Sequence, residues 1–250
     1  MGKELAVKEE KQEMKTFEAS AALEDFAEDM DGLEFRPERI KVPGAGGLSF
    51  AVTDELGNDD AQKTITGVIV YKHPMNSYYV NEYTGGNEPP DCWSTDGKVS
   101  ESGKLCAKCE YNQFESKGLG KACANKQVLY ILGEGEILPR ILYLPPTSLG
   151  NLRQYVQRLI SRGNALKNIV TEISLEKAQS KDGIAYSRVK FTASRKLNGN
   201  ETETIESVRQ FCVGYSKRAP VEELSDSGGF SEASAEDLEY AQEVFGETSD

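Results

Sequence analysis

The chain has 250 residues, of which 38% are hydrophobic, and this is enough for one sizeable domain with a packed core. It begins with the charged stretch MGKELAVKEEKQEMK and contains no run near the roughly 18 apolar residues of a membrane span, so we expect neither a secretion signal nor a membrane segment. The net charge of −12 argues against nucleic acid as a partner of the chain taken as a whole.

The charge is divided unevenly along the chain. Residues 1–60 carry 7 basic and 16 acidic side chains, and residues 221–250 carry 10 acidic side chains and no basic one. The remainder, 61–220, has 22 basic and 15 acidic side chains and a net charge of +7. We therefore expect three parts, namely an acidic, largely disordered segment 1–33, a basic β-rich domain 34–219 and an acidic, largely disordered tail 220–250.

The sequence pattern in the first half of the chain predicts one short helix and two strands. An amphipathic pattern around 17–30 favours a helix within the acidic segment. Leu48–Thr53 is a possible strand, and Thr64–Tyr71 (TITGVIVY) has the β-branched, apolar composition of a largely buried one. The stretch 54–62 between them reads as a polar break.

The second half begins with a predicted hairpin and a helix. Gln127–Leu132 and Ile137–Leu144 are apolar runs separated by GEGE, which is typical of a hairpin. Two prolines end the second run, and Thr147 or Ser148 can then cap a helix that closes at Gly163. The apolar residues of this helix recur at helical spacing: Leu149, Leu152, Val156, Leu159 and Ile160.

Further strands are predicted at Ile169–Leu175 and Ile184–Phe191, joined by a turn. A helical stripe then includes Cys212, which we interpret as a core residue, and ends near Gly214. Glu236–Phe245 is a short amphipathic stretch within the acidic tail. Together the pattern predicts an α+β or mainly β fold with one long connecting helix, and a small barrel is compatible with it.

A Gly- and Cys-rich stretch at about 85–127 interrupts this pattern and is too poor in apolar residues to close a core alone. Its cysteines follow the spacing Cys92-x13-Cys106-x2-Cys109-x13-Cys123. A C-x2-C pair reaches one tetrahedral ion from a tight turn, and two further thiolates complete a closed site. The sequence therefore predicts one structural zinc ion in a zinc-ribbon-like insert within a cytoplasmic protein. A redox pair at Cys106 and Cys109, or unrelated buried cysteines, are the alternatives.

No convergent catalytic set is apparent, so we expect no enzyme. The single histidine, His73, lacks the H-x-E context of zinc deaminases and reads as a satisfied side chain near a strand end. Gly118–Ala122 resembles a phosphate-binding loop only in part, because a glycine and a hydroxyl are missing. Glu134 and Glu136 lie at a predicted hairpin tip, where solvated turn residues are the simpler interpretation.

The basic part of the chain combines positive charge with aromatic rings, which is what sequence-independent binders of single strands need. The candidate nucleic-acid contacts are Tyr78, Tyr79, Trp93, Lys98, Lys108, Tyr111, Phe114, Lys117, Lys121, Arg153 and Arg158. The alternative is that the tyrosines pack in a β core and the lysines only solvate the insert. An acidic tail either occupies a basic groove or recruits partner proteins, and it also serves solubility alone.

Several segments resemble a group of proteins encoded by bacteriophages and integrated mobile elements of Gram-positive bacteria. They are NEPPDCWSTDGK (87–98), CAKCEYNQF (106–114), GLGKAC (118–123), LYILGEGEILPRILYLPPTSLGNLRQYV (129–156) and GIAYSRVKF (183–191), and the resemblance spans roughly 35–195. The layout is also similar to phage single-stranded-DNA-binding proteins, which combine an OB-type barrel, sometimes a zinc module, and an acidic tail. The end of the tail departs from that pattern, since it lacks a terminal proline-phenylalanine.

These observations lead to two functional hypotheses. The first is a non-catalytic, zinc-containing binder of single-stranded DNA in phage or mobile-element replication or recombination, with the acidic tail contacting replication or recombination proteins. The second is a protein-interaction adaptor or host-inhibitory factor in which the basic charge is incidental. On the first hypothesis, affinity should fall steeply with salt.

Overall fold

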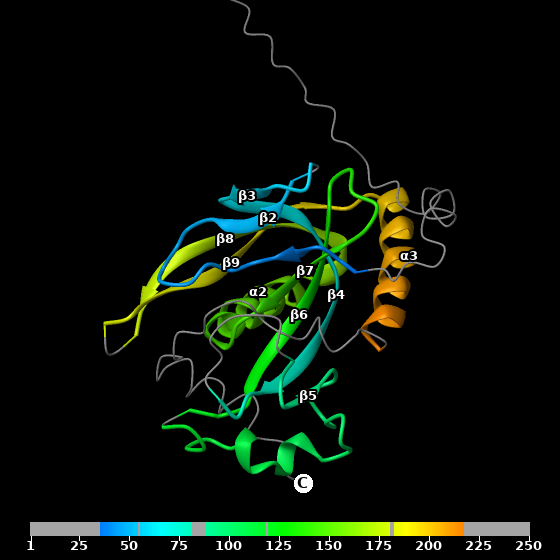
Figure 1. The fold of residues 1–250 in the computed structure, drawn as a ribbon. Helices are drawn as coiled ribbons and strands as arrows, with labels where there is room; N and C mark the ends of the chain where they lie inside the picture. Colours follow the sequence, from blue (N-terminus) through cyan, green and yellow to red (C-terminus); the bar gives the residue numbers. More distant parts are fainter. Residues whose placement is uncertain (1–35, 55, 82–88, 119, 181–182, 218–250) are drawn as a thin grey trace, which may run out of the picture.

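A computed structural model describes residues 36–54, 56–81, 89–118, 120–180 and 183–217 (Figure 1). The predicted N-terminal segment, its helix at 17–30 and the tail peptide Glu236–Phe245 lie outside these ranges. The strands are β1 (Arg39–Ile40), β2 (Phe50–Thr53), β3 (Asp59–Gln62), β4 (Thr64–Tyr78), β5 (Cys92–Ser94), β6 (Ala124–Gly133), β7 (Arg140–Leu144), β8 (Ile169–Gln179) and β9 (Ala185–Lys196). The longer helices are α2 (Leu149–Ile160) and α3 (Gly199–Ser216).

One curled sheet dominates this mixed α/β fold. Its path is β1-β7-β6-β4-β8-β9, and β5 pairs with the far end of β4. All neighbours run antiparallel except β1 and β7, which are parallel. The coarse prediction of a mixed fold built on a curved β-sheet is confirmed, and the sheet forms a half-barrel (Figure 1).

Strand β4 is the longest strand and joins the two ends of the molecule. Along one edge, Thr64–Val68 pairs with β8 and 76–78 pairs with β5. Along the other edge, β6 pairs with β4 from Gly67 to Ser77. The predicted buried strand at 64–71 therefore exists but continues for 15 residues, to Tyr78.

An irregularity in the β4–β6 ladder favours the curl of the sheet. The register of β4 against β6 shifts between Ile69 and Tyr71, and bulges of this kind bend a strand and increase its twist. Close to this point, a Cβ atom on Gly67 would lie only 2.5 Å from the carbonyl oxygen of Leu132. Glycine at this position therefore permits an approach of two backbones that no other residue allows.

Side chains alternate between two cores on opposite faces of the sheet. On β6, Leu129 and Ile131 belong to the core beneath α2, whereas Val128 and Tyr130 belong to the core beneath α3. We call the α2 side the inner face and the α3 side the outer face. Period-two alternation in one strand thus supplies both cores, so both faces of the sheet centre are covered.

Helix α2 forms at the predicted position, but its start differs in detail. Ser148 precedes the helix, yet its hydroxyl makes no cap and instead accepts a hydrogen bond from the backbone N–H of Val189 at 2.9 Å. Gly163 adopts a φ of 69° just after the helix, as expected for a C-terminal glycine. Ile160, predicted on the apolar stripe, is 65% exposed. The hydrogen bond between Ser148 and Val189 ties the start of the helix to β9.

Helix α3 is fixed at its N-terminus by a capping box. The side chain of Asn198 accepts from the Glu201 backbone N–H at 3.0 Å, and the Glu201 carboxylate accepts from the Asn198 backbone N–H at 2.8 Å. Arg195 at the end of β9 donates to the same carboxylate at 2.9 and 3.0 Å. Cys212 is fully buried in the outer-face core, which confirms its interpretation as a core residue.

The predicted polar break at 54–62 is wrong in part, because it contains β3. The strand forms a small two-stranded sheet with β2, pairing from Phe50 opposite Gln62 to Thr53 opposite Asp59. The carboxylate of Asp54 accepts from the backbone N–H of Asn58 at 2.8 Å and so turns the chain. Polar residues form this strand because it is exposed, which apolar patterning does not reveal. No helix among the described residues is long and apolar enough to cross a membrane.

Candidate functional site: the cysteine module and the outer face

The connection from β4 to β6 carries all four cysteines predicted to bind zinc. We call its described part from Cys92 to Cys123 the cysteine module; it hangs from the end of the half-barrel (Figure 1). Apart from β5, its described residues form only short 3-10 turns, bends and isolated bridges. The module therefore depends on backbone hydrogen bonds and on its contact with β4 for its shape.

Backbone hydrogen bonds draw the cysteine segments together. The Cys106 N–H donates to the carbonyl of Lys98 at 2.8 Å, and the Cys109 N–H donates to the carbonyl of Cys106 at 3.3 Å. The Cys123 N–H donates to the carbonyl of Tyr111 at 2.7 Å. Three of the four cysteines are thus anchored by contacts within the module, and Cys92 is anchored by its pairing in β5.

The thiols of Cys92 and Cys123 are disfavoured from ionising by burial and by their neighbours. Burial, and after it the neighbouring Cys106, Cys109 and Cys92, raise the pKa of Cys123 to about 12. Burial, then the carboxylate of Glu101, then Cys109 and Cys106 raise the pKa of Cys92 to about 11. Within the ranges the structure describes, no group of three His, Cys, Asp or Glu side chains is found that could hold a metal ion.

The aromatic residues of the module are used in packing. Tyr78 at the end of β4 stacks on Tyr111, with ring centroids 4.3 Å apart and planes 13° apart. The ammonium of Lys121 lies over the ring of Phe114 at 4.7 Å. Trp93 packs against the outer-face core. Each of these rings therefore helps to hold the module, although Tyr111 remains 42% exposed.

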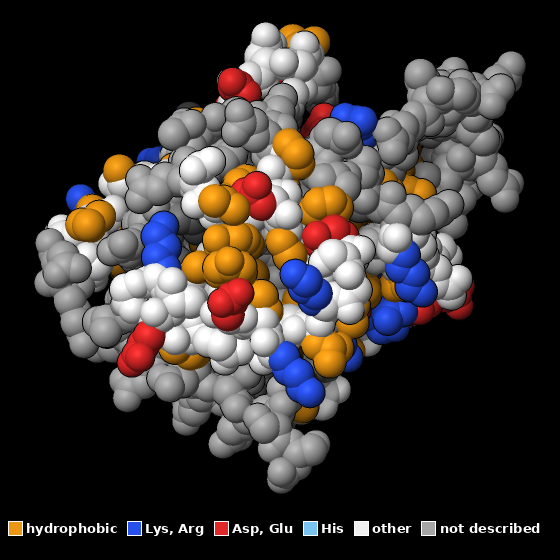
Figure 2. Space-filling view, turned by 60° about the horizontal axis from the view of Figure 1, so that its bottom comes forward, with side chains coloured by type: hydrophobic (Ala, Val, Ile, Leu, Met, Phe, Trp, Pro, Cys, Tyr) orange, Lys and Arg blue, Asp and Glu red, His pale blue; other side chains and the backbone are white. Residues whose placement is uncertain are grey.

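The predicted basic contacts of the module lie at its surface. Lys98, Lys108 and Lys117 are exposed, and Lys121 is half-buried. Figure 2 turns the lower end of the molecule forward and shows hydrophobic side chains in the middle of this face, with basic and acidic side chains interspersed around them. The described part of this face is therefore charged in both senses and does not form a continuous basic field.

The remaining candidate contacts lie elsewhere. Arg153 and Arg158 are exposed on α2, the helix that covers the inner face, whereas Trp93 belongs to the outer face. A shallow hollow of about 380 Å³ on α2 is lined by Gln154, Gln157, Arg158 and Ser161. Tyr79 is half-buried just beyond β4. The predicted contacts are thus distributed over the module and α2.

A group of aromatic side chains on the outer face was not predicted as a site. We call it the aromatic strip: Tyr71 and His73 on β4, Tyr130 on β6 and Tyr143 on β7. The rings of Tyr71, His73 and Tyr130 lie 5.7–5.8 Å from one another. The available signal was the period-two spacing, which puts Tyr71 with His73, Val128 with Tyr130, and Ile141 with Tyr143 on one face.

Arginine guanidinium groups lie against two rings of the aromatic strip. Arg39 on β1 lies over Tyr143 at 5.2 Å from the ring centroid. Arg209 on α3 lies over Tyr71 at 6.0 Å and also donates to Glu206 at 3.3 Å. Both distances fall within the range of cation–π attraction. The strip therefore combines aromatic faces with positive charge.

His73 is a hydrogen-bonded side chain within this strip. Its Nδ1–H donates to the carbonyl oxygen of Thr95 at 2.8 Å and to that of Pro74 at 3.0 Å, so its Nε2 accepts from the hydroxyl of Tyr130 at 3.4 Å. Burial lowers the pKa of the imidazole because it disfavours the charged form. The interpretation of His73 as a satisfied side chain is confirmed, but its predicted place near a strand end is wrong, because it lies within β4. The bond to Thr95 joins the strip to the module.

The carboxylates Glu134 and Glu136 do not form an acid–base pair. Glu136 accepts from the backbone N–H of Gly133 at 2.9 Å and pairs with Arg140 at 2.7 Å. Glu134 pairs with Arg195 at 2.9 Å. Glu136 therefore stabilises the β6–β7 hairpin internally, and Glu134 joins the hairpin to β9.

Comparison of the chain with family models, curated proteins and solved structures found no match.

Proposed function

We propose that this protein binds single-stranded DNA through an OB-like sheet and does so without catalysis. The observation that carries the proposal is the strand connectivity. The chain runs through β4, β6 and β7 as a meander, crosses by α2, and returns through β8 and β9 to the other edge of β4. A long, bulged first strand shared between the second and fourth strands is compatible with an open five-stranded OB-type barrel.

The position of the cysteine module supports this proposal. OB folds bind oligonucleotides on the face of their second and third strands and on the loop that joins the first strand to the second. The corresponding loop is the connection between β4 and β6, where exposed Lys108 and Lys117 and half-exposed Tyr111 lie. Phage or mobile-element replication or recombination is the setting implied by the sequence resemblance.

The module is further proposed to hold one structural zinc ion through Cys92, Cys106, Cys109 and Cys123. The C-x2-C spacing, and the backbone hydrogen bonds that hold Cys106, Cys109 and Cys123 in one module, support this ligand set. Thiols crowded in a partly buried site have raised pKa values, and a divalent cation reverses that effect by stabilising the thiolates. The role of the ion is to fold a segment that has little apolar core of its own.

Binding is tested with the full chain and fluorescently labelled oligo-dT in an anisotropy titration at low salt. Affinity should fall steeply as salt rises, since each phosphate contact releases counterions. Duplex DNA of the same length is the control and should bind more weakly, because its bases are not available for stacking. Absence of salt-sensitive binding to oligo-dT, both in the full chain and after removal of residues 221–250, would exclude the proposal.

Zinc is tested by metal analysis and by replacement with cobalt, whose absorption reports tetrahedral thiolate ligation. The purified protein should contain about one zinc per chain. Cys106→Ser should lose the metal, whereas the matched control Cys212→Ser should keep it because Cys212 lies in the outer-face core. A metal-free protein whose module stays protected from proteolysis after Cys106→Ser would show that no ion is needed.

Exposed apolar side chains on the module favour the second candidate, a protein-interaction adaptor or host-inhibitory factor. Val99 and Leu105 are 42% and 53% exposed and face each other across an antiparallel bridge. Neighbouring exposed apolar groups are typical of protein contact sites. A stoichiometric partner that is retained after nuclease treatment and lost in Val99→Ser would support this candidate over the first.

A further inference from the structure

We propose that the aromatic strip, flanked by Arg39 and Arg209, is the track on which bases of a bound single strand stack. The inference rests on the proposed function and goes beyond it, because it assigns base contact to the outer face of the sheet. None of these residues was among the contacts predicted from the sequence. The lysines of the module then mainly contact the phosphate backbone of the DNA.

The arrangement of the rings is the first argument. Three rings of the strip are half-buried, namely Tyr71, His73 and Tyr143. Each presents part of its side chain at the surface, while the strand that carries it fixes its position. Tyr130 is only 2% exposed, and its ring contacts those of Tyr71 and His73. Rings fixed in this way lose little entropy when a planar base stacks on them.

The position of the arginines is the second argument. A guanidinium over a ring stacks on planar groups and pairs with phosphate in the same orientation. Arg39 and Arg209 come from different elements, β1 and α3, yet each lies against a ring of the strip. The arginines can contact the phosphates of a nucleic-acid strand, and the rings can stack on the faces of its bases.

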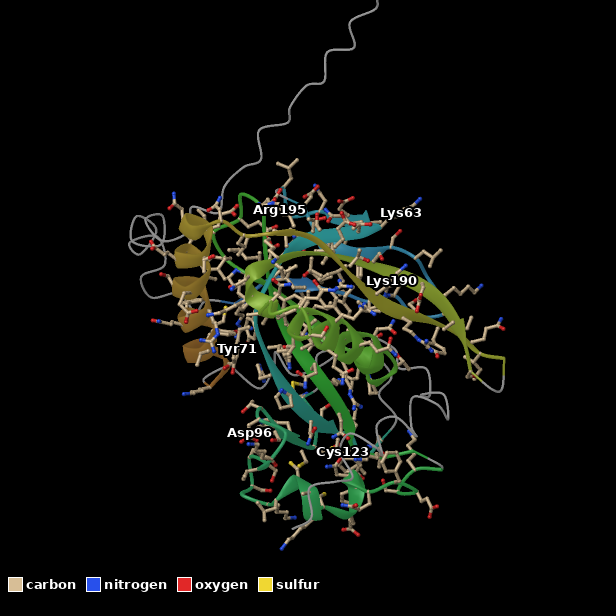
Figure 3. All side chains as sticks on the ribbon, turned by 180° about the vertical axis from the view of Figure 1, so that it is seen from behind. Lys63, Tyr71, Asp96, Cys123, Lys190 and Arg195 are labelled. Carbon is tan, nitrogen blue, oxygen red and sulfur yellow. The ribbon has the colours of Figure 1, made fainter. Side chains whose placement is uncertain are left out.

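The location in the fold is the third argument. The strip crosses β4, β6 and β7, which correspond to the first three strands of the OB-like arrangement. Helix α3 covers one part of the same face through Ile205 and Val208, and Tyr71 lies beside the C-terminal end of this helix (Figure 3). The hydrogen bond between His73 and Thr95 joins the strip to the module. A DNA single strand bound on this track would therefore run between α3 and the cysteine module.

The test uses the full chain and labelled oligo-dT, with variants that replace a ring by a smaller apolar side chain. Tyr71→Leu and Tyr143→Leu should each weaken binding about fivefold or more, the order of one lost base stack. Tyr143→Phe keeps the ring and should bind nearly as the wild type does. Arg39→Gln should also weaken binding and reduce the salt dependence. Arg162→Gln, an exposed arginine just beyond α2, is the matched control and should change little.

The single tryptophan provides a second readout. Trp93 packs against the outer-face core, so its fluorescence should change when a strand occupies the adjacent strip. Unchanged affinity in Tyr71→Leu, Tyr143→Leu and Arg39→Gln, with weakened binding in Lys117→Gln, would overturn the inference and leave the proposed function standing. A change of oligomeric state in these variants without a change in affinity would instead make the strip a self-association surface. If the wild type binds no oligonucleotide, both proposals fail together.

Discussion

Replacing Glu201 by glutamine tests how α3 is held on the outer face. Glu201 is 3% exposed and receives two hydrogen bonds from Arg195 and one from the backbone N–H of Asn198. Glutamine has nearly the same shape, but it is neutral and has only one acceptor oxygen. The substitution therefore removes the charge and at least one hydrogen bond while it adds no volume.

The expected loss of stability is about 2–3 kcal/mol. Breaking a buried ion pair costs about 3–5 kcal/mol when one charge is left without compensation. The loss should be smaller here because Arg195 keeps its pairing with Glu134 at 2.9 Å and its side chain is 20% exposed. Glu203→Gln on the exposed side of the same helix is the matched control, and its effect should stay within about 0.5 kcal/mol.

The pH dependence gives the prediction a sign. Burial raises the pKa of Glu201, but hydrogen bonds from Arg195 and Asn198 outweigh burial and hold the pKa below 4.5. The folded protein therefore binds this proton less readily than the unfolded chain. The stabilisation by Glu201 is complete above the unfolded pKa and is lost as the pH falls through the lower, folded value.

Urea unfolding of the wild type and both variants, at pH 7 and at several values below pH 4.5, measures these quantities. The free-energy difference between the wild type and Glu201→Gln should be largest at neutral pH and should shrink as the solution becomes more acidic. If Glu201→Gln costs no more than Glu203→Gln at pH 7, or if its cost does not change with pH, the carboxylate does not anchor the helix as argued.

Three further predictions follow from single contacts. Gly67→Ala should destabilise the fold strongly in thermal melting, because its Cβ would lie 2.5 Å from the carbonyl oxygen of Leu132; full stability would refute the close approach. Ser148→Ala should cost about 1–3 kcal/mol in urea unfolding, since the buried N–H of Val189 loses its acceptor, and a smaller cost would mean that this N–H finds another partner. Lys117→Gln should reduce the slope of log affinity against log salt by about 0.7, and an unchanged slope would remove this lysine from the phosphate contacts.

The sequence alone determined most of the regular elements. The β-branched run from Thr64 to Tyr71, the hairpin around GEGE and the helix before Gly163 were all predicted, because period-two and helical spacing of apolar residues act locally. Cys212 was also assigned correctly to a core, since it lies on the buried stripe of α3. Strand β3 was missed because its side chains are polar and exposed, and its pairing with β2 involves the backbone.

The candidate site was predicted only in part, for a different reason. The glycines and cysteines between Cys92 and Cys123 marked this stretch as distinct from the strands around it, because it has few apolar residues. The spacing did not reveal that Tyr78 stacks on Tyr111, or that Arg153 and Arg158 belong to a helix over the other face of the sheet. Residues far apart in sequence meet only after the strands have paired.

The aromatic strip shows most clearly what the tertiary structure alone decided. Composition placed Tyr71, Tyr130 and Tyr143 in a β-rich, basic part of the chain, and period-two spacing settles which face of its own strand each one occupies. Strand order, the bulge after Ile69 and the packing of α3 bring Tyr71 against Tyr130 and place Arg209 over Tyr71 and Arg39 over Tyr143. Local patterns thus determined the elements, whereas long-range backbone pairing determined which side chains share a surface.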